Sequence, residues 1–168
     1  MNPQGRTKHF AILIFGAPLS GKTFFAEQFR KRYNTNYLDF THLIDTYNIK
    51  NKDIQKFLTG VLKNDQDLII EGCLATEADR NSIRSICRKA GYIPILIWVQ
   101  TNPATLKRRA AKLKGDDKKQ LHQDKMKKYQ APSVLERPVV ISGRFSFELQ
   151  CRVVLKALSR SLKIHDAN

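Results

Sequence analysis

The sequence predicts an α/β fold of three layers, in which a five-stranded parallel sheet lies between two layers of helices. Short apolar runs of strand length alternate with longer segments of helical periodicity along the 168 residues. This alternation is typical of a parallel sheet with helices on both faces. The length and an apolar content of 42% suffice for one hydrophobic core, so we expect residues 1–168 to form one domain.

The first strand is predicted at Phe10–Phe15, a continuous apolar run. It leads into Gly16-Ala17-Pro18-Leu19-Ser20-Gly21-Lys22-Thr23, which fits G-x-x-x-x-G-K-[ST], the Walker A or P-loop pattern. The next segment, residues 22–32, carries Phe25 and Phe29 at helical spacing. A strand, a tight loop and a helix N-terminus in this order direct backbone N–H groups and a positive helix end toward an anion.

This loop predicts a nucleoside triphosphate site, with ATP and Mg²⁺ as the expected ligands. In such a loop Lys22 adds a positive charge on the β- and γ-phosphates, and the Thr23 hydroxyl ligates Mg²⁺. Leu19 stands where many P-loops have a third glycine, and we expect it to be tolerated because only its backbone N–H is needed. The residues of the loop predicted to bind ATP are Gly16, Ala17, Leu19, Ser20, Gly21, Lys22 and Thr23.

The central part of the chain predicts two further strands. A short strand is expected at residues 36–40 and a helical stretch at 41–63, with a break near 48–52. The third strand, residues 68–70, is finished by Glu71-Gly72, and a helix at 77–90 is closed by a glycine.

The C-terminal part predicts the last two strands. A fourth, β-branched strand is expected at residues 93–99, followed by a helix at 104–114 that Asn102 caps and a proline opens. A turn at 115–117 precedes a second basic helix. The fifth strand is expected at residues 139–141 and the last helix at 147–162, with frayed residues from 163 onward.

Carboxylates end the second and third strands, and ligands of an open α/β sheet bind beyond the strands' carboxyl ends. Asp39 there is a candidate general base for an attacking hydroxyl, or alternatively the N-cap of the next helix. Glu71 stands in the Walker B position, where it can hold Mg²⁺ through a water or orient the acceptor. Since glutamate replaces the usual aspartate, direct contact with the metal is in question. Gly72 would let a substrate approach the backbone.

Two arginines and a glycine follow the last strands. Arg108 and Arg109 lie on the helix after the fourth strand, where a guanidinium can bind phosphate oxygens; both could be surface charges, but two arginines at this place favour a phosphate contact by at least one of them. Ser142-Gly143-Arg144 leaves the fifth strand where an adenine could lie over the P-loop. We therefore assign Arg108, Arg109, Ser142 and Gly143 to ATP binding, with Lys22, Asp39 and Arg109 as catalytic residues and Thr23 and Glu71 as the metal site.

The net charge of +15 favours polyanionic partners. Much of it lies in residues 103–130, which we expect to form a short helical lid. Two interpretations of this segment fit equally: a solubilising face, or a surface for nucleic acid or phosphate. Its basic residues are Lys107, Arg108, Arg109, Lys112, Lys114, Lys118, Lys119, Lys125, Lys127 and Lys128.

The three cysteines show no C-x-x-C spacing, and we expect reduced core thiols in a cytoplasmic protein. Apolar runs fall short of the roughly 18 residues that span a bilayer, and the polar first residues do not resemble a signal peptide. The sequence gives no indication of oligomeric state.

With these residues placed, the chain resembles the small P-loop kinases of the nucleoside-monophosphate-kinase-like superfamily. It is most similar to the AAA-like ATP-binding group that includes polynucleotide 5′-hydroxyl kinase domains and zeta-toxin-like kinases. The resemblance rests on the P-loop and on the segments LDF with Asp39, LIIEG with Glu71, NPATLKRR with Arg109, and MKKYQAPSVLE with Pro132 and Glu136. The chain departs from the group at Glu71 and at Leu113, where a second lid arginine is absent.

The resemblance implies a kinase that transfers the γ-phosphate of ATP to a hydroxyl, with the carboxylate after the second strand as base and lid arginines on the phosphates. The charge favours a nucleotide or polynucleotide 5′-hydroxyl as acceptor. Two alternatives stay open: a kinase of nucleosides or sugars, and an ATP-binding module or NTPase that acts through an RNA or protein partner.

Overall fold

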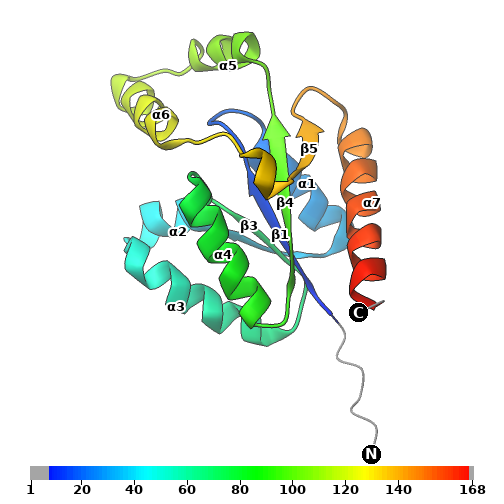
Figure 1. Ribbon diagram of the computed structural model, residues 1–168. Coiled ribbons are helices and arrows are strands. Elements are labelled where there is room, and N and C mark those ends of the chain that lie inside the picture. Colours follow the sequence, from blue (N-terminus) through cyan, green and yellow to red (C-terminus); the bar gives the residue numbers. More distant parts are fainter. Residues whose placement is uncertain (1–7, 167–168) are drawn as a thin grey trace, which may run out of the picture.

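The computed structural model describes residues 8–166, apart from the side chains at 51, 52 and 166. Strands and helices alternate along this part of the chain (Figure 1). The strands are β1 (Phe10–Phe15), β2 (Asn36–Asp39), β3 (Leu68–Glu71), β4 (Ile93–Gln100) and β5 (Val139–Ser142). The α-helices are α1 (Lys22–Tyr33), α2 (Phe40–Tyr47), α3 (Asn51–Val61), α4 (Glu77–Lys89), α5 (Pro103–Ala110), α6 (Asp116–Lys128) and α7 (Phe147–Asp166), with short 3₁₀ turns at Leu62–Asn64 and Val134–Glu136.

The five strands of residues 8–166 form one parallel sheet in the order β2-β3-β1-β4-β5. The P-loop strand β1 lies at its centre, and every residue of β1 is buried. Strands covered on both faces are apolar throughout instead of alternating, which explains the uninterrupted run from Phe10 to Phe15. Because all strands are parallel, their carboxyl ends, including Asp39 and Glu71, lie along one edge of the sheet.

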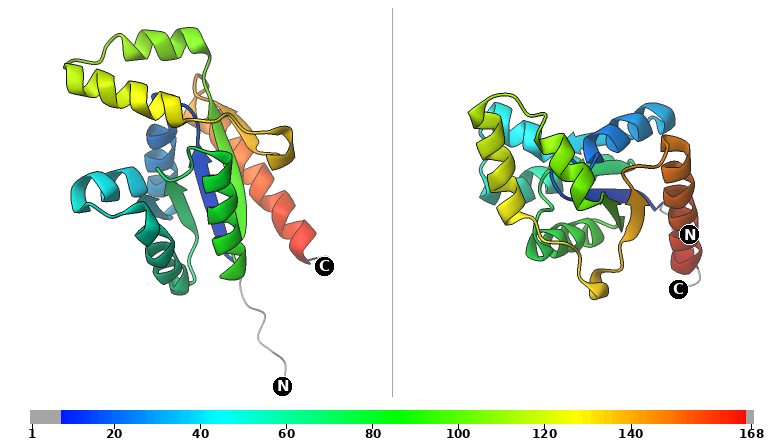
Figure 2. Two further views of the ribbon diagram at one scale, coloured as in Figure 1. Left: turned by 60° about the vertical axis from the view of Figure 1, so that its left-hand side comes forward. Right: turned by 90° about the horizontal axis from the view of Figure 1, so that it is seen from above.

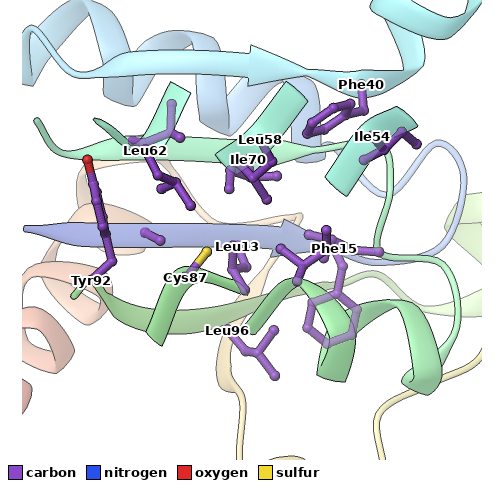
Figure 3. Packing of buried hydrophobic residues seen from close by; sticks show 14 residues of the cluster. Leu13, Phe15, Phe40, Ile54, Leu58, Leu62, Ile70, Cys87, Tyr92 and Leu96 are labelled. Carbon is purple, nitrogen blue, oxygen red and sulfur yellow. The ribbon is translucent and has the colours of Figure 1, made fainter. Parts of the chain in front are cut away.

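Two apolar cores flank the sheet. Helices α3 and α4 cover one face, where Leu58 and Cys87 pack on Leu13 and Ile70 (Figure 3). Helices α1 and α7 cover the other face, where Phe25 and Val154 belong to the same cluster as Ile12 and Ile97 of the central strands. The predicted three-layer arrangement with a five-stranded parallel sheet is therefore confirmed.

Helices α5 and α6 form a hairpin beyond the carboxyl ends of the strands (Figures 1 and 2). Helix α6 contains no buried residue, as its sequence of lysines and acids suggests. The chain returns from it to the sheet through residues 129–138. The α5–α6 hairpin thus lies over the edge of the sheet at which the P-loop begins.

Two helix ends differ from the sequence prediction by several residues. Helix α5 ends at Ala110 instead of residue 114, because the chain turns at Ala111 and reverses at Gly115, whose φ is 91°. Helix α7 continues to Asp166 instead of fraying from residue 163. Its last turn is supported by Lys8, whose Nζ donates a hydrogen bond to the carbonyl of His165. Among the described helices, none combines the length and the apolar character needed to cross a membrane.

Candidate phosphate-binding site

The P-loop connects β1 to α1 at the centre of the sheet edge. Gly21 precedes the helix, no side chain caps this end, and no acidic residue lies in the first turn. The N–H groups of the first turn therefore face the loop without a side-chain acceptor, as a phosphate site requires. Leu19 has φ of 66°, in the left-handed region. The position thus needs a left-handed backbone as well as an N–H, and the sequence-based reason for tolerating leucine was incomplete.

The Lys22 side chain lies along the loop and donates a hydrogen bond from Nζ to the carbonyl oxygen of Ala17 at 3.0 Å. Burial has the largest influence and lowers the pKa of its ammonium group. The nearby carboxylates of Glu71 and Asp39 raise this pKa, and the positive charge of Lys125 lowers it further. Lys125 belongs to α6, so the charge of the hairpin acts on the P-loop lysine. A bound polyphosphate would replace the Ala17 carbonyl as the partner of Lys22 and favour its charged form.

Thr23 and Glu71 are in direct contact. The Thr23 hydroxyl donates to Glu71 Oε1 at 2.9 Å, and the Tyr37 hydroxyl donates to Glu71 Oε2 at 2.8 Å. Glu71 is only 4% exposed, and its burial raises the pKa of the carboxyl, while Lys22 and the two hydroxyl donors oppose the rise. The two residues predicted to form the metal site therefore lie beside each other, and the sequence analysis did not identify Tyr37 as their neighbour.

The oxygens of Thr23 and Glu71 fit a site for Mg²⁺. Hard cations take oxygen ligands, and Mg²⁺ is usually held by one or two protein groups together with substrate phosphates and waters. Within residues 8–166 no group of three or more His, Cys, Asp or Glu side chains could hold a metal by itself. The oxygens of this pair are consistent with a cation whose remaining ligands come from a nucleotide. They are too few to form a site from protein ligands alone.

Asp39 ends β2 next to Glu71, with which it is in register. Its Oδ1 accepts hydrogen bonds from the backbone N–H groups of Thr41 at 2.8 Å and His42 at 3.3 Å, so it is the N-cap of α2. Both bonds use the same oxygen, and Oδ2 accepts no hydrogen bond from the described residues. The two roles considered for this residue are compatible, because capping fixes the carboxylate and leaves one oxygen available.

Gly72 serves packing instead of the substrate approach expected from the sequence. A Cβ built on it would lie 2.3 Å from the backbone nitrogen of Thr41. The glycine thus allows the start of α2, which Asp39 caps, to approach the end of β3.

Arg109 and Arg108 point in different directions from α5. Arg109 Nη1 donates to the carbonyl of Leu19 at 2.7 Å, and its Nη2 lies 3.5 Å from the carbonyl of Gly143. Arg109 therefore bridges the P-loop and the loop after β5. Arg108 is exposed and makes no hydrogen bond or ion pair in the described part of the chain.

The loop after β5 packs directly on the P-loop. Gly143 N donates to the carbonyl of Gln100, and the Ser142 carbonyl accepts from Gln150. A Cβ at Gly143 would lie 2.2 Å from the Ser20 carbonyl oxygen and equally close to Thr101 Oγ1, which itself donates to that carbonyl. Ser142 and Gly143 thus lie where the sequence placed them, beside the P-loop, and only glycine fits at the contact.

Comparisons with known proteins agree with this fold. The sequence matches no family model and no curated protein. The structure is similar to a gluconokinase from Sinorhizobium meliloti 1021, with a TM-score of 0.66 and 15% identity over 95% of this chain and 97% of that one. It is also similar to the Mycobacterium tuberculosis APS kinase CysC solved with AMPPNP and APS (TM-score 0.65, 18% identity, 90% and 98% covered). A third match is Chaetomium thermophilum Kti12 in complex with ADP-AlF3 (TM-score 0.65, 14% identity, 89% and 97% covered). The chain thus has the fold of the P-loop kinases, and the narrower likeness to polynucleotide kinases stays a prediction.

Proposed function

We propose that the chain is an ATP-dependent phosphotransferase that transfers the γ-phosphate to a hydroxyl group. The observation that carries this proposal is the Thr23–Glu71 hydrogen bond, which joins the P-loop to the acid at the end of β3, beside Asp39. A P-loop alone indicates nucleotide binding. The neighbouring carboxylate with an available oxygen adds a base for an acceptor. The fold shared with a gluconokinase and an APS kinase supports the same reaction class.

Each residue of the site has its own role in the proposed reaction. Asp39 Oδ2 takes the proton of the acceptor hydroxyl as its oxygen bonds to the γ-phosphorus, and the bond from that phosphorus to the bridging oxygen of ADP breaks. Lys22 and the P-loop N–H groups hold the phosphates, and Arg109 stabilises the negative charge that spreads over them. Thr23 and Glu71 would hold Mg²⁺, which would supply positive charge to the phosphates of ATP.

The proposed acceptor is a nucleotide or the 5′-hydroxyl of a polynucleotide. The support is electrostatic: the chain carries +15, and the α5–α6 hairpin, the proposed lid, contributes a large share of its lysines. Helix α6 has no buried residue, and its lysines beside the proposed active site attract polyanions at long range.

Transfer of label from γ-labelled ATP in the presence of Mg²⁺ tests the reaction. The acceptors are 5′-hydroxyl oligonucleotides, nucleosides, nucleoside monophosphates, gluconate and other sugars. We expect labelled product that is lost in Lys22→Ala and Asp39→Asn and kept in the exposed controls Lys31→Ala and Asp45→Asn. Release of free phosphate alone, unaffected by Asp39→Asn, would show an NTPase and refute the proposal. Label only on gluconate or another sugar would keep the reaction and refute the proposed acceptor.

A further inference from the structure

A cavity of about 550 Å³ lies between the α5–α6 hairpin, the end of β4 and the P-loop. Its size is within the range of small-molecule sites, roughly 300–1,000 Å³. It reaches the P-loop at Ala17, whose carbonyl accepts the hydrogen bond of Lys22. A molecule bound in the cavity therefore lies next to the residue that would hold the transferred phosphate.

The two faces of α5 separate this cavity from the site beside Arg109. Thr105 and Arg109, four residues apart, lie on the face where Arg109 bonds to the P-loop and to Gly143. Leu106 and Ala110, also four residues apart, lie on another face and line the cavity. The cavity is thus a second compartment, which the phosphate-binding loop borders on one side.

The walls of the cavity are mainly apolar and aromatic. Trp98 and Tyr129 form one wall, and because Trp98 Nε1 donates to the Tyr129 hydroxyl at 3.0 Å, the two rings are held together. Leu106 and Met126 contribute apolar surface from the two helices of the hairpin. Methionine adapts its shape to an aromatic ring and makes favourable sulfur–aromatic contacts.

His122 supplies a polar group without a partner. It lines the cavity, and its Nδ1 is buried and makes no hydrogen bond with the described residues. A buried ring nitrogen of this kind costs free energy unless a ligand or water satisfies it. At the same cavity wall Lys107 provides an exposed positive charge.

These features favour a planar heteroaromatic ligand over a sugar. A nucleobase has two apolar faces and hydrogen-bonding groups confined to its edge, which matches walls that are mainly apolar and aromatic and carry a few polar side chains, Gln100 and His122 among them. A polyhydroxylated chain would bring hydroxyls against Trp98, Leu106 and Met126, where few would find partners, and each unpartnered hydroxyl would weaken binding.

We propose that this cavity is the acceptor subsite and binds the base of a nucleoside or nucleotide, with Trp98 and Met126 against the ring and the His122 side chain beside its edge. This inference rests on the proposed phosphotransfer and does not change which bonds form and break in it. Lys107 then faces a phosphate on the same acceptor. The acceptor's hydroxyl is directed past Ala17 toward the γ-phosphate.

Trp98 is the only tryptophan of the sequence, so its fluorescence reports directly on the cavity. The protein is first saturated with AMPPNP and Mg²⁺, with binding followed by calorimetry, so that the P-loop is occupied. Nucleosides and nucleoside 3′-monophosphates, and in parallel gluconate and ribose, are then titrated with excitation at the red edge of tryptophan absorption. We expect a saturable fluorescence change with base-bearing compounds alone.

Two substitutions on α6 provide a matched pair. Met126→Glu puts a charge into the cavity wall and is expected to weaken the fluorescence-detected affinity roughly tenfold or more. Leu121→Glu, at an exposed position of the same helix outside the cavity, should leave it unchanged. His122→Phe keeps an aromatic ring at this position and removes both ring nitrogens, and we expect a loss of roughly 2–10-fold.

The outcomes separate the two proposals. If AMPPNP binds but no base-bearing compound changes the fluorescence, or if gluconate or ribose does so instead, the inference is refuted and the phosphotransfer stands. Equal weakening by Met126→Glu and Leu121→Glu would also refute it, because the effect would not depend on the cavity. If AMPPNP itself fails to bind, the proposed function is refuted, and with it the acceptor subsite.

Discussion

Replacing Glu136 by glutamine should destabilise the fold strongly, because this residue neutralises an arginine inside the protein. Arg80 on α4 is 0% exposed. Its Nε and Nη2 donate to the two carboxylate oxygens of Glu136 at 2.6 and 2.8 Å, and its Nη1 donates to the carbonyls of Leu74, Ala75 and Gln130. The pair therefore ties the segment after α6 to α4.

The magnitude follows from burial. Removing one partner of a buried ion pair leaves an uncompensated charge and costs about 3–5 kcal/mol of unfolding free energy. A domain of this size has roughly 5–15 kcal/mol in total, so the variant should be marginally stable. In thermal unfolding the same loss corresponds to a decrease in Tm of roughly 6–20 °C. Replacing both partners, as in Arg80→Met with Glu136→Leu, removes the charge as well and should recover most of the stability.

Urea unfolding followed by circular dichroism measures the effect. The matched control is Asp124→Asn, since Asp124 forms an exposed ion pair with Lys127 at 3.6 Å, and its removal should change the unfolding free energy by less than about 1 kcal/mol. If the unfolding free energy of Glu136→Gln lies within about 1 kcal/mol of the wild-type value, the reasoning is refuted, because a loss that small is typical of a surface ion pair.

The same pair predicts a pH dependence. The hydrogen bonds from Arg80 hold the pKa of Glu136 below its ordinary value of 4.5. A carboxyl with a depressed pKa in the folded state contributes its full stabilisation above its ordinary pKa, and the contribution is lost as the pH falls through the folded-state value. The difference in unfolding free energy between the wild type and Glu136→Gln should therefore be constant above about pH 5 and shrink in more acidic solution.

Three further substitutions test the site. Tyr37→Phe removes a hydrogen-bond donor to Glu71 and should raise the Mg²⁺ concentration needed for half-maximal activity roughly tenfold. Nucleotide binding measured by calorimetry without metal should stay unchanged. An unchanged Mg²⁺ requirement would contradict the role of Tyr37. Leu19→Gly should raise the unfolding free energy by about 0.5–1 kcal/mol in urea, since glycine adopts the left-handed backbone without strain; a loss of stability would contradict it. Gly143→Ala should weaken ATP binding roughly tenfold, about 1.4 kcal/mol, because its Cβ displaces the P-loop; calorimetry with wild-type affinity would show that the loop tolerates the shift.

The sequence predicted the parts of the site that local pattern encodes. The P-loop motif, the acid at the end of β3 and the arginine on the helix after β4 each sit at a fixed offset from a strand. The parallel sheet then brings strand ends together, which is why Thr23 and Glu71, 48 positions apart, are in contact. The topology was therefore sufficient to place Glu71 beside the P-loop before its contacts were known.

Other features depend on tertiary contacts that no local pattern encodes. Tyr37 reads as an ordinary strand residue, and its hydroxyl becomes important only through the pairing of β2 with β3. Arg80 belongs to a helix with an ordinary charged sequence, yet its side chain is fully buried against Glu136, 56 positions later. Charged residues are normally read as exposed, so sequence reasoning misses buried pairs of this kind.

The α5–α6 hairpin combines firm attachment at its two ends with an exposed middle. On the α5 side Asn102 caps the helix, and Arg109 donates a hydrogen bond to the P-loop. After α6 the Tyr129 hydroxyl accepts a hydrogen bond from Trp98, and the backbone N–H of Gln130 donates to the carbonyl of Ala75. Between these points α6 buries no residue, so few apolar contacts oppose its displacement. Its lysines therefore add little to the folded core and remain available to anions. A polyphosphate on the P-loop would attract these lysines by charge.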